Sequence, residues 1–334
     1  MKTKVKIYLT VVIAIIFTLQ SCQPDETYTR ISGETQGTTY NIIYNKSEML
    51  KHEIDSLLHN FDKSLSTYID GTIISKVNNN EQVELDEYFI SVFNKSMEIS
   101  EKTDGMFDIT VAPLINAYGF GFTEETGVSD TIIDSLLQFV GFDKIKLENN
   151  KIIKTDPRVM IDCNAIAQGY AVDIVANFLD KKGCNNYMIE IGGELITKGK
   201  NEFGENWKIG IDKPIEGSDT QNREIQTIVT ISDKAMATSG DYRRYKVKDG
   251  IKYSHSINPK TGKTAKDNLL SVTILAEDCM TADGYATACM IVGLEKAKKI
   301  VEDNEDMEAY FIYSDNKGEY QIYFTEGFKE FILE

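Results

Sequence analysis

Strand-like segments occur in runs along this chain, and this order limits the folds that it can adopt. From Trp207 to Ala276, short stretches rich in β-branched and aromatic residues follow one another, and two more, Ala309–Tyr313 and Tyr320–Phe324, close the chain. A doubly wound fold would instead place a helix between successive parallel strands. The sequence therefore predicts an α+β fold with mixed, mostly antiparallel sheets and flanking helices.

Amphipathic helices are predicted before and after these runs. Their apolar residues recur at helical spacing, as do Phe89, Val92 and Phe93. The chain has only five prolines and no low-complexity linker, so one domain is expected from residue 31 to residue 334. The predicted helices are Glu48–Leu65, Asp86–Lys102, Asp130–Val140, Ala165–Lys181, Asp278–Val292 and Leu294–Asn304, and the strands Thr38–Tyr44 and Tyr187–Ile191 lie between them.

The N-terminus is typical of an exported protein that carries a lipid. Three lysines precede an apolar run from Ile7 to Leu19, which is too short to span a bilayer comfortably, and Cys22 follows a small residue as in a bacterial lipobox. We expect residues 1–21 to be a lipoprotein signal peptide and residues 22–30 a tether. Lipidated Cys22 would anchor the protein to the extracytoplasmic (periplasmic) face of a membrane of the bacterial cell envelope. The alternative is an ordinary signal with an incidental cysteine.

Charge and cysteine spacing exclude several classes of protein. The net charge is −16, and removal of the signal with its three lysines would take it to −19. A nucleic-acid partner is disfavoured, because phosphate backbones require concentrated Lys and Arg. No two cysteines form a C-x-x-C pair, so no zinc or redox motif is indicated. The cysteines beyond the signal can form disulfides or be buried, and they are Cys163, Cys184, Cys279 and Cys289.

His255 is the first candidate for proton transfer. It lies in the segment from Met236 to Gly262, which combines a serine–glycine turn, a Tyr/Arg pair and a Pro-Lys-Thr-Gly turn. The other two histidines, His52 and His59, belong to a predicted amphipathic helix, where a solvated or half-buried position explains them. His255 is therefore the residue expected to act as a base near neutral pH.

Asp283 and Thr287 form a candidate metal site. They are four residues apart in a predicted helix, so one carboxylate and one hydroxyl project from the same face. Such hard oxygen ligands suit magnesium, which often keeps waters and binds substrate phosphates. The alternative is an acidic residue that interacts with the helix dipole.

Three kinds of turn could contact a nucleotide, and each has a structural alternative. Asp162 ends a predicted strand before a helix that begins with small residues, or it caps that helix. The pair Gly192-Gly193 exposes amides to an anion or forms a plain β-turn. Aromatic residues set among small ones suit a planar ring ligand or the core, and they occur in Gly37–Tyr40, Leu65–Tyr68 and Gly105–Thr110.

In this order, the segments resemble the ApbE family of flavin transferases, which are FAD:protein FMN transferases. Thr238–Arg243 (TSGDYR) and Ser254–Gly262 (SHSINPKTG) are similar to two long motifs of the family, and Asp104–Gly121 (DGMFDITVAPLINAYGFG) matches another. The similarity extends from about Gly37 to Gly293 and covers most of the chain beyond the signal.

The resemblance implies that FAD is the donor substrate and Mg²⁺ the metal. A threonine or serine of a target protein attacks the FMN phosphate, AMP leaves, and FMN remains as a phosphoester. The resemblance suggests targets among the subunits of Na⁺-translocating NADH:quinone reductase or Rnf-type complexes. The alternatives are a magnesium-dependent FAD pyrophosphatase, in which water replaces the hydroxyl, and a non-enzymatic FAD-binding lipoprotein.

The resemblance also assigns roles to individual residues. His255 and Asp283 are the expected catalytic residues, and Asp241 and Arg243 are lesser candidates. Asp283, Thr287 and a main-chain oxygen of Ala165 are expected to bind the metal. Contacts with the flavin nucleotide fall on Gln36, Tyr68, Met106, Phe107, Asp108, Asp162, Gln168 and Ile257.

Four positions depart from the family pattern. Gln36 replaces a frequent methionine, and Gln168 replaces a charged residue before Gly169. Asn258 replaces the aspartate of the histidine motif, so no carboxylate can act there. Ala286 lacks the additional carboxylate of some members, so the metal is expected to depend more on water or phosphate.

Overall fold

The computed structural model describes residues 27–123, 128–215, 217, 222–241, 245–248, 251–265 and 268–333. The predicted signal peptide, the lipidation site Cys22, and Tyr242 and Arg243 of the TSGDYR motif lie outside these residues. Within the described ranges, no helix combines the length and apolarity that crossing a membrane requires.

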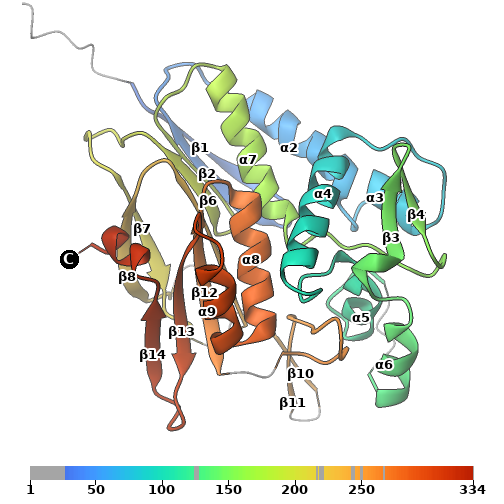
Figure 1. The fold of residues 1–334 in the computed structure, drawn as a ribbon. Helices are drawn as coiled ribbons and strands as arrows, with labels where there is room; N and C mark the ends of the chain where they lie inside the picture. Colours follow the sequence, from blue (N-terminus) through green and yellow to red (C-terminus); the bar gives the residue numbers. More distant parts are fainter. Residues whose placement is uncertain are drawn as a thin grey trace, which may run out of the picture.

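An eight-stranded sheet forms the centre of the molecule (Figure 1). Its strand order is β1-β2-β5-β6-β9-β12-β13-β14, and every neighbouring pair is antiparallel, which confirms the predicted fold class. The strands are β1 (Thr29–Thr35), β2 (Thr38–Tyr44), β5 (Tyr187–Ile191), β6 (Glu194–Lys198), β9 (Lys234–Gly240), β12 (Leu269–Ala276), β13 (Glu308–Ser314) and β14 (Tyr320–Phe324).

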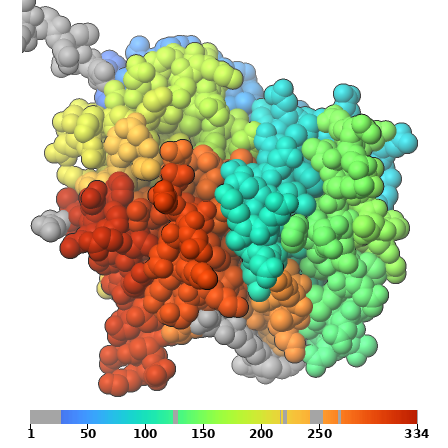
Figure 2. Space-filling model, viewed as in Figure 1, coloured from blue at the N-terminus to red at the C-terminus, as the bar shows by residue number. Residues whose placement is uncertain are grey.

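Helices cover one face of this sheet. Helix α7 (Ala167–Lys181) packs on β5 and β6, and α8 (Cys279–Val292) packs on β9 and β12, with α2 (Lys51–Leu65) and α4 (Glu87–Lys102) beside them (Figure 1). Helix α9 (Leu294–Glu302) follows α8 and contacts β13. In the space-filling view these helices join into one continuous surface (Figure 2).

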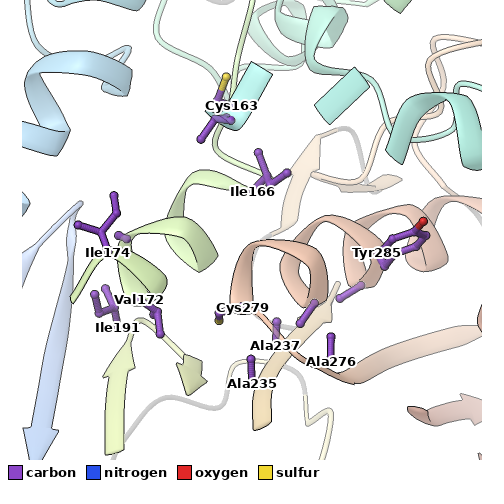
Figure 3. Close-up of a cluster of buried hydrophobic side chains, with 14 of the residues drawn as sticks. Cys163, Ile166, Val172, Ile174, Ile191, Ala235, Ala237, Ala276, Cys279 and Tyr285 are labelled. Atoms are coloured by element: carbon purple, nitrogen blue, oxygen red, sulfur yellow. The ribbon is translucent and has the colours of Figure 1, made fainter. Parts of the chain in front are cut away.

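Small residues let α8 approach the sheet closely. Ala235, Ala237 and Ala276 lie beneath Cys279 at the start of α8 (Figure 3), and all four are buried. Side chains alternate between the faces of a strand, so Met236, between two of these alanines, points to the opposite face. All four described cysteines are free and buried, which resolves the open alternative in favour of core residues.

A two-stranded sheet packs on that opposite face. Strands β7 (Trp207–Asp212) and β8 (Ile225–Ile231) form an antiparallel pair. Together with Met236 and Leu275 of the large sheet, and with Phe328 in the short helix η3 (Gly327–Phe331), they enclose a second hydrophobic core. The sheet is thus the middle layer of three.

The remaining elements surround one end of the sheet. Ile257, Tyr118 and Ile133 belong to a third small core between α5, α6 and the segment after β11. The elements of this region are α3 (Ile73–Asn78), η1 (Ile109–Val111), α5 (Ala112–Ala117), α6 (Asp130–Leu137), η2 (Phe142–Lys144), β3 (Ile145–Glu148), β4 (Lys151–Lys154), β10 (Tyr245–Lys248) and β11 (Ile251–Ser254).

Three local predictions were wrong. Strand β1 begins at Thr29, inside the expected tether, and its polar sequence is stabilised by Tyr40, whose ring covers Gly33 on the neighbouring strand. The expected serine–glycine turn at residues 239–240 is the end of strand β9. The predicted strand that would end at Asp162 is absent. The backbone N–H and C=O of Ile161 bond to the side-chain oxygen and nitrogen of Asn78, and not to a neighbouring strand.

Candidate active site

Most of the predicted site residues line one cavity of about 960 Å³. It lies where β6 and β9 separate, between α7, α8, the segment around η1 and strand β7. Ten of the residues named from the sequence line it, and they are Tyr68, Phe107, Asp108, Asp162, Ala165, Gln168, His255, Ile257, Asp283 and Thr287. The structure therefore brings together residues that are up to 219 positions apart in the chain.

Gln36 and Met106 do not line the cavity. Gln36 occupies the β1–β2 turn with a φ of 51°, and its side chain lies near Asp62. Met106 is half-buried in the loop after α4, where its N–H donates to the carbonyl oxygen of Thr103. Their predicted contacts with the flavin nucleotide are not supported by this geometry.

The cavity opens through a fork in the sheet. Strands β6 and β9 pair only from Leu195–Thr197 to Lys234–Met236, whereas β9 remains paired with β12 as far as Gly240. Residues 238–240 consequently have a strand on one side only, and they line the cavity. The turn Gly192-Gly193 lies at the end of the other branch.

That glycine turn is structural. Gly192 and Gly193 have φ angles of 65° and 115° and connect β5 to β6. The Gly192 N–H donates to Thr39 O, and the Gly193 N–H donates to Glu190 Oε1. A Cβ atom on Gly192 would lie 1.7 Å from Nε2 of Gln168, so Gln168 packs directly against this turn. The β-turn interpretation is correct, and neither amide is free for an anion.

Asp283 is a buried carboxylate at the junction of α7 and α8. Its Oδ2 accepts a hydrogen bond from the Gly169 N–H at 3.0 Å, and this is its only hydrogen bond within the described ranges. Burial raises the pKa of Asp283 to about 7, and the Gly169 hydrogen bond opposes the shift. The carboxylate is therefore poorly solvated and would gain from a cation.

The same hydrogen bond frees a carbonyl group. In a regular helix the Gly169 N–H would donate to Ala165 O, four residues earlier, but it donates to Asp283 instead. The φ of −154° at Ile166 is not helical, so α7 begins at Ala167 and not at the predicted Ala165. In the described part of the chain, the Ala165 oxygen accepts no hydrogen bond, and the residue lines the cavity.

The oxygen ligands of this site fit magnesium. The carboxylate of Asp283, the hydroxyl of Thr287 and the carbonyl of Ala165 are hard oxygen ligands that line one cavity. The described residues contain no cluster of three or more His, Cys, Asp or Glu side chains suited to a metal. An ion bound here would therefore complete its shell with water or phosphate oxygens.

Asp173 is a site-supporting residue that sequence reasoning did not single out. It is four residues after Gly169 on the same face of α7, and its two oxygens accept hydrogen bonds from the N–H groups of Cys279 and Met280, both at 2.8 Å. Asp278 caps the next N–H, that of Thr281. These contacts fix the N-terminus of α8 against α7, although burial raises the pKa of Asp173 to about 7.

Asp162 and Asp108 line the cavity, but turns already engage their carboxylates. Asp162 accepts from the backbone N–H of Asn164 at 2.7 Å and from its side chain at 3.0 Å. This is a local turn and not the predicted helix cap, because the N-cap of α7 is Ile166, without a side-chain capping bond. Asp108 accepts from the backbone and hydroxyl of Thr110. Burial raises the pKa of both carboxyls, that of Asp162 to about 6.

His255 lies beside an acidic residue at the end of β9. Its Nδ1 is 3.6 Å from Oδ1 of Asp241, and the same oxygen accepts a hydrogen bond from the Ser256 hydroxyl at 2.7 Å. The Phe120 ring meets the imidazole edge-on at a centroid distance of 6.5 Å. The imidazole side chain is 36% exposed, so it is both oriented and accessible from the cavity.

The turn after His255 is fixed by Asn258. Its Oδ1 accepts hydrogen bonds from the N–H groups of Lys260 and Thr261 at 2.9 and 3.1 Å. Tyr118 donates to Gly262 O, and Lys260 forms an ion pair with Asp104 at 2.5 Å. The side-chain oxygen of Asn258 therefore does the work that an aspartate would do here, without a charge.

Comparisons with known proteins agree with this geometry. Residues 36–311 match the sequence model of the ApbE family. The chain is 35% identical to the FAD:protein FMN transferase of Vibrio cholerae serotype O1 over 333 residues, covering 96% of this chain and 98% of the relative. For the enzyme of the same description from Haemophilus influenzae, the identity is 35% and the coverage 92% of each chain.

Solved structures give the same result. The flavin transferase ApbE from Vibrio cholerae superposes with a TM-score of 0.82 at 35% identity, covering 91% of this chain and 99% of that one. The apo flavinyl transferase ApbE from Pseudomonas stutzeri superposes with a TM-score of 0.80 at 29% identity, covering 91% and 96%.

Proposed function

Because this chain belongs to the ApbE family, and is a transferase like its relatives, we propose that it moves FMN from FAD to a threonine or serine hydroxyl of a target flavoprotein. The observation that carries the proposal is that one cavity is lined by His255, which has Asp241 beside it, and by Asp283, Thr287 and Ala165. A base and an oxygen-ligand site are the two parts that transfer of an FMN phosphate requires.

The proposed reaction balances as a substitution at phosphorus. The acceptor oxygen bonds to the phosphorus of the FMN moiety, the bond from this phosphorus to the bridging oxygen breaks, and AMP leaves with that oxygen. The acceptor hydroxyl loses its proton to His255. Asp241, beside Nδ1, stabilises the imidazolium that results.

Magnesium, held by Asp283, Thr287 and the Ala165 carbonyl, would neutralise charge on the pyrophosphate oxygens. The protein itself holds these oxygen ligands in position. Gly169 orients the Asp283 carboxylate, and Asp173 holds the first turn of α8 in place. Both contacts are present in the protein alone, so the donors are positioned before a substrate binds.

We also infer where the protein works. The predicted signal peptide at residues 1–21 and lipidation of Cys22 would place the domain on the extracytoplasmic face of the cell envelope. Targets there would include flavoprotein subunits of Na⁺-translocating NADH:quinone reductase or Rnf-type complexes. Incorporation of labelled palmitate into wild-type protein, and not into a Cys22→Ser variant, tests the anchor.

Mass spectrometry of a target domain tests the activity. Wild-type enzyme with FAD and Mg²⁺ should add the mass of FMN, less water, to the domain, and a domain with its acceptor threonine replaced by alanine should remain unlabelled. Free FMN and AMP without labelling would show a pyrophosphatase instead. Intact FAD throughout would show binding alone.

A further inference from the structure

Strand β7 presents its edge, and not a face, to the cavity. Five consecutive residues, from Lys208 to Asp212, line the wall. Successive side chains of a strand point to opposite sides, so a wall built from every residue in turn is made by the backbone edge. Sequence reasoning did not identify this wall, because edge exposure leaves no pattern in the residues.

The direction of the backbone groups follows from the strand pairing. On the far side of β8, the Leu333 N–H donates to Ile228 O at 2.9 Å, so the backbone groups of Ile228 point away from β7. Gly210 lies opposite Ile228, so its own N–H and C=O groups also point outward, away from β8. Lys208, two residues earlier and without an intervening bulge, has the same orientation.

These outward groups have no protein partner in the described part of the chain. No hydrogen bond joins the backbone N–H or C=O groups of Lys208 or Gly210 to another described residue. Two neighbouring side chains, in contrast, already have partners. Glu190 accepts from Asn41 and Gly193, and the Lys208 ammonium pairs with Glu205. The edge of β7 is therefore a part of this wall that is open to new backbone hydrogen bonds.

We propose that the acceptor segment of the target protein binds as an added strand along the edge of β7, next to Lys208 and Gly210. This inference rests on the proposed function, in which the second substrate is a hydroxyl on a polypeptide. An extended segment supplies complementary backbone hydrogen-bond donors and acceptors whatever its side chains are, as in other cases of strand addition. The edge and His255 line the same cavity, so a segment bound along the edge would bring its hydroxyl into the cavity that contains the base.

A matched pair of proline variants tests the proposal. Gly210→Pro removes an outward N–H on the cavity side, and the three atoms nearest to a Cβ there all belong to the Ile225 side chain, the closest at 3.3 Å. Thr230→Pro removes an N–H on the other side of the same hairpin, where it faces Phe331 of η3 and not the cavity. The probe is the soluble flavoprotein domain of an Na⁺-translocating NADH:quinone reductase. Gly210→Pro should raise the KM for this domain about tenfold relative to Thr230→Pro.

Affinity for FAD, measured by flavin fluorescence, should be the same in both variants. An equal KM for the domain in both variants would overturn the proposal.

Hydrogen exchange supplies a measurement that does not depend on these variants. The same domain with its acceptor threonine replaced by alanine cannot react, but it should slow amide exchange at Lys208 and Gly210, whereas FAD alone should not. Unchanged exchange at both amides would also refute strand addition. Failure of the wild-type enzyme to label the unaltered domain would refute the proposed function, and the exchange result would still decide whether the edge binds it.

Discussion

The Gly169 N–H donates to Oδ2 of Asp283 at 3.0 Å, so the start of α7 is bonded directly to α8 at the wall of the cavity. This contact orients the carboxylate and leaves the Ala165 carbonyl without its helical donor. Two oxygen ligands of the proposed magnesium site therefore arise from one displaced hydrogen bond.

Asp283→Asn should abolish transfer while leaving the fold intact. The amide oxygen can still accept from Gly169, but the charge that binds the cation is lost, so the rate of FMN incorporation should fall at least about a hundredfold. Mass spectrometry of the target gives the rate, and thermal unfolding gives the control. Transfer within a few-fold of wild type would mean that the metal is held elsewhere.

His255→Ala should slow transfer by about 10²–10⁴-fold, because the hydroxyl loses its base. Asp241→Asn should reduce kcat less, about tenfold, with unchanged affinity for FAD, because it removes only the charge beside Nδ1. His52→Ala, on the exposed face of α2, is the matched control and should behave as wild type. A full rate in His255→Ala would exclude it as the base.

Gly169→Ala should destabilise the protein by about 1–3 kcal/mol, since the new Cβ would lie 2.4 Å from the backbone oxygen of Cys279, which cannot move alone. Gly284→Ala is the control, because its Cβ would meet the end of the Ile99 side chain, which can rotate. Chemical denaturation compares the two. Equal losses would show that the contact between α7 and α8 can relax.

The metal-free protein should lose stability as pH rises from about 5 to 8. The folded-state pKa values are about 6 for Asp162 and about 7 for Asp173 and Asp283, above the usual carboxyl value of 3.8. The folded state therefore binds protons that the unfolded state has released, and their stabilisation is lost as pH passes through the folded-state values. Thermal unfolding in EDTA measures the decline, and Mg²⁺ should reduce it by favouring ionised Asp283. A rise in stability over this interval would contradict the assignment.

Asn258→Asp, which introduces the residue common in the family, should leave transfer within about twofold of wild type. Either side chain offers an oxygen to the N–H groups of Lys260 and Thr261, and the turn depends on that oxygen. Steady-state kinetics with both substrates is the measurement. A large gain in kcat would reveal a role for the carboxylate beyond the turn.

The sequence predicted the parts of the fold that local patterns encode. Strand β2 and strand β14 have the predicted bounds, and α4 differs by a single residue. Strand β1 was missed, because its polar residues become a strand only when Tyr40 packs over Gly33. The short elements α3, α5, β3 and β4 were also missed, and they too have little periodicity of their own.

The site was predicted to the extent that residue type reveals chemistry. His255, Asp283 and Thr287 do line one cavity, but the roles of Asp173 and of the β7 edge depend on contacts between distant segments. Gln36 and Met106 occupy positions that the family motifs assign to flavin contacts, but neither residue lines the cavity.

The fork between β6 and β9 also leaves a weak line in the sheet. Three register pairs join β6 to β9, against six between β9 and β12, so the sheet is weakest along the line that enters the cavity. One half carries α7 with Ala165, and the other carries α8 with Asp283. The hydrogen bonds of Asp283 with Gly169, and of Asp173 with Cys279 and Met280, join the two halves across this line. The spacing of the oxygen ligands therefore depends on the contact between α7 and α8 more than on the sheet beneath them.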